Sequence, residues 1–176
     1  MGMKRISLLI VVGTFSIFTA ASARGADASA PCMASAEARQ LDFWVGDWAV
    51  ASPGMAGKGH STVHLSLDKC MMIESWGSDT SNHDGENTLA YNAEDKSWYG
   101  LFVDNQGRVH MMKGAVTPGS AEFQGSGRDE NGGEVVKRVR VVRVNADNVE
   151  QIWEKSSDHG ASWVIDFKME YVRKKS

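Results

Sequence analysis

The clearest hydrophobic pattern of the chain runs from Trp163 to Arg173. Large apolar residues occupy every second position of this stretch, and Asp166, Lys168 and Glu170 lie between them. Successive side chains of a strand point to opposite faces, so the alternation predicts a β-strand with one buried and one solvent-facing side. Weaker alternation recurs at residues 63–67 and 98–102.

Short segments of this kind follow one another from residue 47 onward, separated by turn signals about every 8 to 15 residues. No helical period lies between them, so neighbouring strands should be antiparallel. Closure into a barrel buries one face of such a sheet and protects its edges. We therefore expect an all-β fold, a closed antiparallel β-barrel of about eight to ten strands, with one short helix at residues 34–40 ahead of it.

The N-terminal sequence has a basic start, an apolar run over residues 6–20 and small residues up to Ala23. This order is typical of a secretory signal peptide, and the run is shorter than the roughly 20 residues of a membrane helix. We expect cleavage after Ala23, with Ala26 and Ala28 as alternatives, a secreted and periplasmic protein, and no stable membrane span. The expected divisions are a signal peptide (1–23), an N-terminal segment with the short helix (24–40) and the barrel domain (41–174).

Composition narrows the partners of the mature chain. Cleavage would leave 153 of the 176 residues, a size typical of one domain. Because Lys4 and Arg5 leave with the signal, 17 basic residues remain against 22 acidic ones, a net charge of about −5. This balance argues against nucleic acid as a partner. In an oxidising compartment, we expect Cys32 and Cys70 to form a disulfide.

Residues 40–50 gather Phe43, Trp44 and Trp48 around Gly46, and alternation places Trp44, Gly46 and Trp48 on one face. Gly46-Asp47-Trp48 resembles the G-x-W signature of the calycin barrels, which include lipocalins, fatty-acid-binding proteins and the nitrobindin-like group. The resemblance implies that Trp48 packs at the closed end of the barrel under an arginine of the last strand, here Arg173. We interpret the cluster as a structural plug, because large aromatic residues are first of all core material.

Residues 38–174 also resemble, as a set, a family of uncharacterised secreted bacterial proteins. That resemblance implies a fold but no settled activity, so no catalytic residue follows from it. The positions that carry it are Phe43, Trp44, Gly46, Trp48, Cys70, Glu74, Trp76, Tyr91, Trp98, Ser156, Asp158, Gly160, Trp163, Tyr171 and Arg173.

Glu74 lies between Met72 and Trp76 in an alternating segment. If Trp76 points into the barrel, Glu74 does too, and a buried carboxylate needs a cationic partner or a raised pKa. Arg138 and Arg140 are candidate partners. The alternative is that both arginines form a solvated outer face and that Glu74 is an exposed strand residue.

Some histidines and methionines suggest a bound metal or haem. His110 and Met112 share a strand face, which suggests a soft copper site completed by Met71 or Met72. Methionine in strands more often fills the core. Haem binding, by analogy with the nitrobindin-like group, would need a histidine in the barrel mouth, for which His64 and His110 are candidates. We assign no metal ligand and no resident cofactor.

A barrel of about eight strands leaves room for side chains or one small ligand. Our leading hypothesis is therefore binding of a small, largely apolar molecule inside the barrel. One alternative is an enzyme of unknown reaction that uses Glu74 as acid or base with a histidine or tyrosine partner; another is a haem or copper carrier. The expected ligand-binding residues are Glu74, Trp76, Tyr91, Trp98, Phe102, Met111, Gln151, Trp153 and Phe167.

Overall fold

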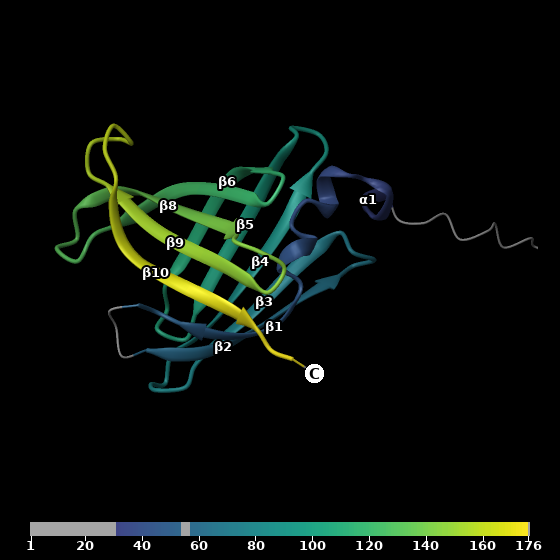
Figure 1. Ribbon diagram of the computed structural model, residues 1–176. Helices are drawn as coiled ribbons and strands as arrows, with labels where there is room; N and C mark the ends of the chain where they lie inside the picture. The colour runs from purple at the N-terminus through teal and green to yellow at the C-terminus, as the bar shows by residue number, and fades with distance from the viewer. Residues whose placement is uncertain (1–30, 54–56, 176) are drawn as a thin grey trace, which may run out of the picture.

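The computed structural model describes residues 31–53 and 57–175. The expected signal peptide lies outside the described residues, as do the three cleavage positions. The described chain forms a closed barrel of ten antiparallel strands (Figure 1), which confirms the expected fold class. The strands are β1 (Gly46–Ala51), β2 (Lys58–Ser66), β3 (Met71–Ser78), β4 (Asp84–Asn92), β5 (Ser97–Asp104), β6 (Val109–Thr117), β7 (Ser120–Arg128), β8 (Glu134–Arg143), β9 (Asn148–Ser156) and β10 (Val164–Arg173).

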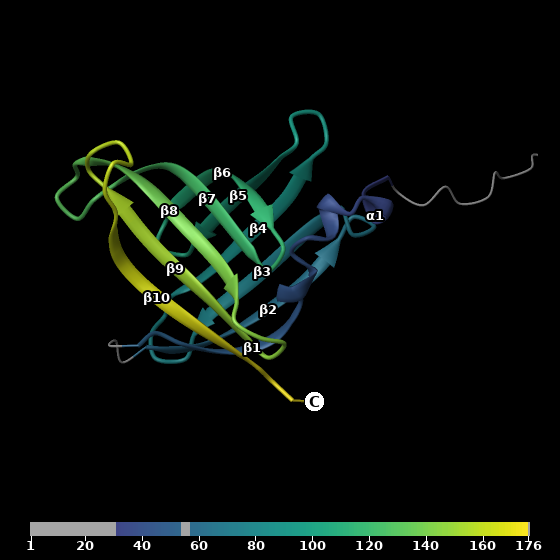
Figure 2. The same ribbon diagram turned by 45° about the horizontal axis from the view of Figure 1, so that its top comes forward.

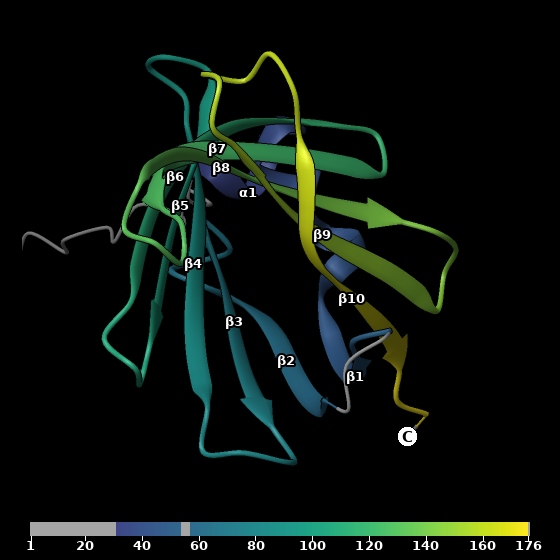
Figure 3. The ribbon, with the colours of Figure 1, turned by 90° about the vertical axis from the view of Figure 1, so that its left-hand side faces the viewer.

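Each strand pairs with the next one along the chain, and β10 returns to pair with β1 (Figure 2). In that closing pair Trp48 lies opposite Arg173, and Val50 lies opposite Tyr171. Because the loops alternate between the two ends, those after β1, β3, β5, β7 and β9 all lie at one end of the barrel. Figure 3 faces the molecule from that side, with the N-terminal helical segment behind the strands.

The opposite end carries the N-terminal segment, which consists of α1 (Pro31–Ala34) and two single 3₁₀ turns, η1 (Glu37–Arg39) and η2 (Asp42–Trp44). The expected helix at residues 34–40 is thus divided between α1 and η1. A disulfide joins Cys32 to Cys70 in the loop between β2 and β3, with a Cα–Cα distance of 5.2 Å, as expected from the sequence. The segment therefore stays attached to this end.

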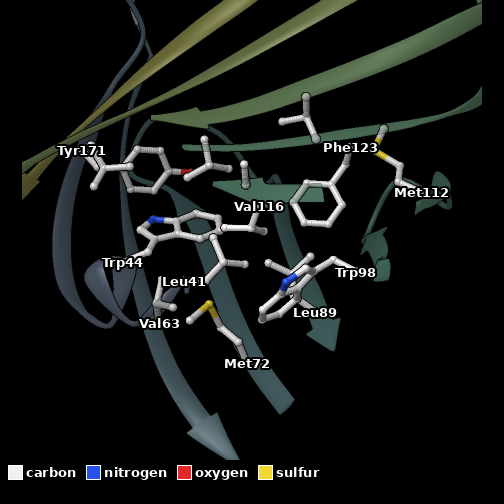
Figure 4. Close-up of a cluster of buried hydrophobic side chains, with 14 of the residues drawn as sticks. Leu41, Trp44, Val63, Met72, Leu89, Trp98, Met112, Val116, Phe123 and Tyr171 are labelled. Carbon is white, nitrogen blue, oxygen red and sulfur yellow. The ribbon is translucent and has the colours of Figure 1, made fainter. Parts of the chain in front are cut away.

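Bulky side chains fill the end of the barrel next to this segment (Figure 4). Leu41, Trp44, Trp48 and Tyr171 are all almost fully buried. Alternation predicted that Trp44 and Trp48 share one face of a strand, but Trp44 belongs to η2 and not to β1. Its indole therefore enters the core from the helical turn. The Trp48 indole N–H donates to the Trp44 carbonyl oxygen at 2.9 Å, which joins the two.

Arg173 covers this end. Its guanidinium carbon lies 4.2 Å from the centroid of the Trp48 ring, within cation–π range. The same guanidinium donates to the carbonyl oxygens of Val45 at 2.9 Å and Phe43 at 3.3 Å. Gly46 has φ +143°, and a Cβ there would overlap the Arg173 side chain. A glycine is therefore needed between the two tryptophans.

Candidate ligand-binding cavity

The other half of the barrel encloses a cavity of about 740 Å³ that reaches the loops after β1, β3, β5 and β7. This volume lies within the usual range of small-molecule sites, about 300 to 1,000 Å³. A second space of about 20 Å³ lies deeper and shares Asn87, Phe102, His110, Gln151 and Trp153 with the first. The barrel interior thus consists of a packed core at the closed end and this cavity at the other end.

Aromatic side chains from four strands form the walls of the cavity: Trp76 on β3, Phe102 on β5, Trp153 on β9 and Phe167 on β10. The Trp153 and Phe167 rings stack with centroids 5.6 Å apart, and Phe102 meets Trp153 edge-on at 6.1 Å. Phe102 lies over Gly85 of β4, where a Cβ would come within 2.8 Å of its ring. The lack of a side chain at Gly85 therefore leaves the space that the Phe102 ring occupies.

His110 of β6 also points into the cavity. Its ring stacks on Phe102 at 6.0 Å and lies 5.6 Å from the Trp153 ring. Burial lowers the pKa of His110, and the positive charges of Lys137 and Arg108 lower it further. The imidazole is therefore neutral near pH 7.

Glu74 lies within the cavity wall on β3 and is only 3% exposed. Its Oε1 accepts hydrogen bonds from the Ser61 hydroxyl at 3.0 Å and the Tyr171 hydroxyl at 2.9 Å. Burial raises the pKa of Glu74 to about 7, against the opposing effect of hydrogen bonds from Tyr171, Ser61 and Asn87. The sequence left open whether Glu74 is buried or exposed, and the structure shows that it is buried.

Tyr171 reaches Glu74 from β10 across the inner faces of β1 and β2. Its neighbour on β1 is Val50, and the partner of Val50 on β2 is Gly59. Ser61 of β2 donates to the same carboxylate oxygen, so the two hydroxyl groups meet at Glu74. Burial raises the pKa of Tyr171 well above its usual value, and the Glu74 carboxylate raises it further, so the hydroxyl remains a donor.

Charged residues surround the mouth of the cavity. The Asp104 carboxylate, whose side chain is fully covered, accepts from Arg108 Nε at 2.7 Å and contacts His83 Nε2 at 3.0 Å. Burial would raise the pKa of Asp104, but the hydrogen bonds from Arg108 and His83 outweigh it and lower the pKa to about 2. This carboxylate is therefore charged and paired at neutral pH.

The last strand departs from the regular alternation that its sequence predicts. The β9–β10 register shifts between Ile165 and Phe167, so that Asp166 is an extra residue. Ile165 is therefore exposed on the outside. Asp166 joins the cavity mouth, where it pairs with Lys137 at 2.7 Å and Lys155 at 3.1 Å.

Arg138 and Arg140 lie on the outer face of β8, which is the second alternative that the sequence left open. Both donate to Glu154 Oε2, at 2.8 and 2.9 Å, and Glu154 is 5% exposed beneath them. Neither arginine pairs with Glu74, so the alternative in which one of these two residues is its cationic partner is ruled out. Strand side chains alternate, and in β8 the residue that lines the cavity is Lys137.

Six of the nine expected ligand-binding residues line the cavity and three do not. Tyr91 and Trp98 pack together in the core at the closed end, and the Trp98 indole N–H is 3.4 Å from Gln40 Oε1. Met111 is 74% exposed on the outer face, because it alternates with His110 and Met112, which point inward. The six that line the cavity are Glu74, Trp76, Phe102, Gln151, Trp153 and Phe167.

Several cavity residues were not expected. Met169 and Tyr171 could have been found from the alternation of the last strand, which places them on the face of Phe167. The mouth residues gave no sequence signal, because they lie in loops and strands of different hairpins that only closure of the barrel brings together. These additional residues include Asn87, His83, Asp104, Arg108, His110, Lys137, Asp166, Met169 and Tyr171.

The residues considered as ligands of a metal ion or haem lie on both the inner and the outer face of the barrel. His64 is exposed on the outside of β2, whereas His110 lines the cavity. Met72 and Met112 are buried in the core. Within residues 31–53 and 57–175, no three side chains of His, Cys, Asp or Glu are grouped to hold a metal ion.

These features define a class of architecture: a ten-stranded antiparallel barrel, closed at one end by a core and hollow at the other. It is compatible with the calycin-like architecture implied by the G-x-W motif. No family model matches the chain, and no curated protein matches its sequence significantly. Among the helices of the described residues, none has the length and apolar character needed to cross a membrane.

Proposed function

We propose that this protein binds a small, largely apolar molecule inside its barrel. The observation that carries the proposal is the cavity of about 740 Å³ with aromatic walls and a polar side at Glu74. Burial of a ligand methylene group in such a site contributes roughly 0.8 kcal/mol. A few polar groups then orient the ligand, as in most small-molecule sites.

Gln151 is suited to be the second polar contact. Its Oε1 accepts from the Trp153 indole N–H at 2.8 Å, which fixes the side chain against the aromatic wall. The amide N–H groups of Gln151 are then available to a ligand acceptor.

We further propose that the protein acts in the periplasm after export, which the Cys32–Cys70 disulfide supports because such bonds persist in oxidising compartments.

Exposure of the purified mature protein to a bacterial lipid extract tests the proposal. After gel filtration, native mass spectrometry should show an added small molecule in about one copy per chain. The same treatment of protein denatured before and during exposure is the control, because it has no folded cavity. A native protein that gains no more mass than the denatured control would contradict the proposal.

A second candidate function follows from the contact between Glu74 and Tyr171. A carboxyl group with a pKa of about 7 can both donate and accept a proton near neutral pH, as general acid–base catalysis requires. This candidate predicts that Glu74→Gln abolishes any turnover found by screening the native protein. An active Glu74→Gln variant would rule it out.

The haem or copper carrier is the remaining alternative, and His110 in the cavity wall is the residue that favours it. It predicts a coloured protein, or stoichiometric metal in elemental analysis, with loss of either in His110→Ala. Metal-free, colourless protein after supplementation with haem and copper would rule it out.

A further inference from the structure

Glu74 differs from the other buried carboxylates of the described chain in lacking a cation. Asp104, Glu154 and Glu74 are the acidic residues in the buried set. Asp104 pairs with Arg108 at 2.7 Å, and Glu154 pairs with two arginines of β8 at 2.8 and 2.9 Å. No basic side chain of the described residues forms an ion pair with Glu74. Its position therefore lacks the counter-charge that the other two have.

The groups around Glu74 are nevertheless arranged for a carboxylate. Ser61 and Tyr171 both donate to its Oε1, and Asn87, its cross-strand partner on β4, also favours the charged form. Donors of this kind favour the charged form, whereas burial without a counter-charge opposes it. A positive charge placed in the cavity beside Glu74 would supply the interaction that the fold leaves out.

The remainder of the cavity suits a cation with an apolar body. Aromatic faces attract organic cations by roughly 0.5 to 2 kcal/mol, and Trp76, Phe102, Trp153 and Phe167 line the same space. The charges at the mouth balance, so an anionic ligand would meet no excess of positive charge. The basic lining residues are Lys58, Arg108, Arg128 and Lys137, and the acidic ones besides Glu74 are Asp104, Asp129, Glu130 and Asp166.

We propose that the ligand class is a small organic cation, an amine or quaternary ammonium with an apolar body, whose positive charge lies beside the Glu74 carboxylate. This inference rests on the proposed function, binding inside the barrel, and adds the charge of the ligand and its position.

Proton release accompanies such binding. Glu74 has a pKa of about 7, and a neighbouring cation lowers that pKa. The affinity for a permanently charged cation is therefore about tenfold weaker one pH unit below 7 than one unit above it. A neutral ligand that accepts a hydrogen bond from protonated Glu74 has the opposite pH dependence.

Few other groups near Glu74 titrate in this range. The side chains that contact it are Ser61 from β2, Asn87 from β4 and Tyr171 from β10, of which only Tyr171 titrates, far above neutral pH. His110 of β6 lies in the same row of paired residues, through Asn87 and Phe102, and burial lowers its pKa. The remaining titratable groups that line the cavity are His83 and the eight charged residues of the mouth named above.

Three fluorescent probes of one shape test the proposal: diphenylhexatriene, its trimethylammonium derivative and its propionic acid derivative. Each is titrated into the native protein, Glu74→Gln and Glu150→Gln at one pH unit below and above 7. Glu150 is the matched control because it lies on the outer face of β9, paired with Lys168. Circular dichroism confirms that each variant is folded.

The trimethylammonium probe should bind the native protein and Glu150→Gln at least tenfold more tightly than the neutral probe above pH 7, and lose about tenfold at the lower pH. Glu74→Gln should lose about tenfold of that preference, keep only the part that the aromatic walls supply, and show no pH dependence. Binding of the neutral probe with no preference for the cation, a preference for the anion, or a cation preference of undiminished size in Glu74→Gln would overturn the inference and leave the proposed function standing. Binding of none of the three to native protein would overturn both.

Discussion

The Tyr171 hydroxyl lies 2.9 Å from Oε1 of Glu74, although 97 positions separate the two residues in the chain. The contact forms because closure of the barrel pairs β10 with β1, which in turn lies beside β2 and, through it, β3. It joins the last strand to the third and fixes the polar side of the cavity. The two partners should have separable effects when they are replaced.

The native protein should lose stability as pH rises because of Glu74, and Glu74→Gln should not show this loss. The folded protein holds the Glu74 proton up to a pH of about 7, whereas the unfolded chain releases it near 4.5. The free energy of unfolding therefore falls as pH rises from about 4.5 to above 7, by about 3 kcal/mol in total from this group. Urea unfolding of native protein and Glu74→Gln across this range measures the difference. The variant should gain relative to native protein as pH rises, and a constant difference would contradict the account.

Tyr171→Phe should raise the pKa of Glu74 above its native value, because it removes a hydrogen bond that favours the charged carboxylate. Carbon-13 NMR titration of the Glu74 carboxyl, assigned with Glu74→Gln, measures this pKa. Tyr99→Phe is the matched control, since the Tyr99 hydroxyl donates to Asp95 on the outer surface. An unchanged or lowered pKa in Tyr171→Phe would show that the contact does not act on Glu74.

Arg173→Ala should destabilise the fold by about 2 kcal/mol or more, because it removes a cation–π contact with Trp48 and two charged hydrogen bonds to backbone carbonyls. Arg173→Lys keeps the charge but not the planar donors, so it should recover only part of the loss. Lys174→Ala, at the exposed neighbouring position, should have little effect in the same chemical denaturation. Equal stability of Arg173→Ala and Lys174→Ala would refute the plug.

Replacement of Cys32 and Cys70 together by serine should lower stability by about 4 kcal/mol on the chain-entropy estimate for the 38-residue separation. The bond holds the N-terminal segment against the β2–β3 loop, so its loss should also loosen this segment, which carries Trp44. Thermal unfolding with and without reductant measures the first effect, and Trp fluorescence the second. A melting temperature unaffected by reductant would contradict a stabilising role.

The fold was largely predictable because period-two alternation and turn residues are local signals. Closure followed from the need to cover sheet edges, and the structure bears it out. The bulge at Asp166 was not predictable, because one extra residue leaves the apolar pattern of the strand intact while it moves Ile165 to the outside. Alternation within a segment shows which residues share a face of the strand. Only the pairing with neighbouring strands determines which of the two faces points into the barrel.

The candidate site was predictable in part for the same reason. Trp153 and Phe102 were expected in the wall and line it. Met111 was placed there on its apolar character alone, although the sequence pairs His110 with Met112 on the opposite face. The Tyr171–Glu74 contact depends on which strands become neighbours after closure, which no single segment encodes.

Methyl NMR of two methionines tests the central claim, occupation of the barrel interior, most directly. Met169 lines the cavity, and Met111 is exposed on the outer face. With methyl-labelled methionine, assigned by Met169→Leu and Met111→Leu, added diphenylhexatriene should shift the Met169 signal through its ring currents and leave the Met111 signal in place. A shift of Met111 with Met169 unchanged would place the ligand on the outer surface and contradict the account.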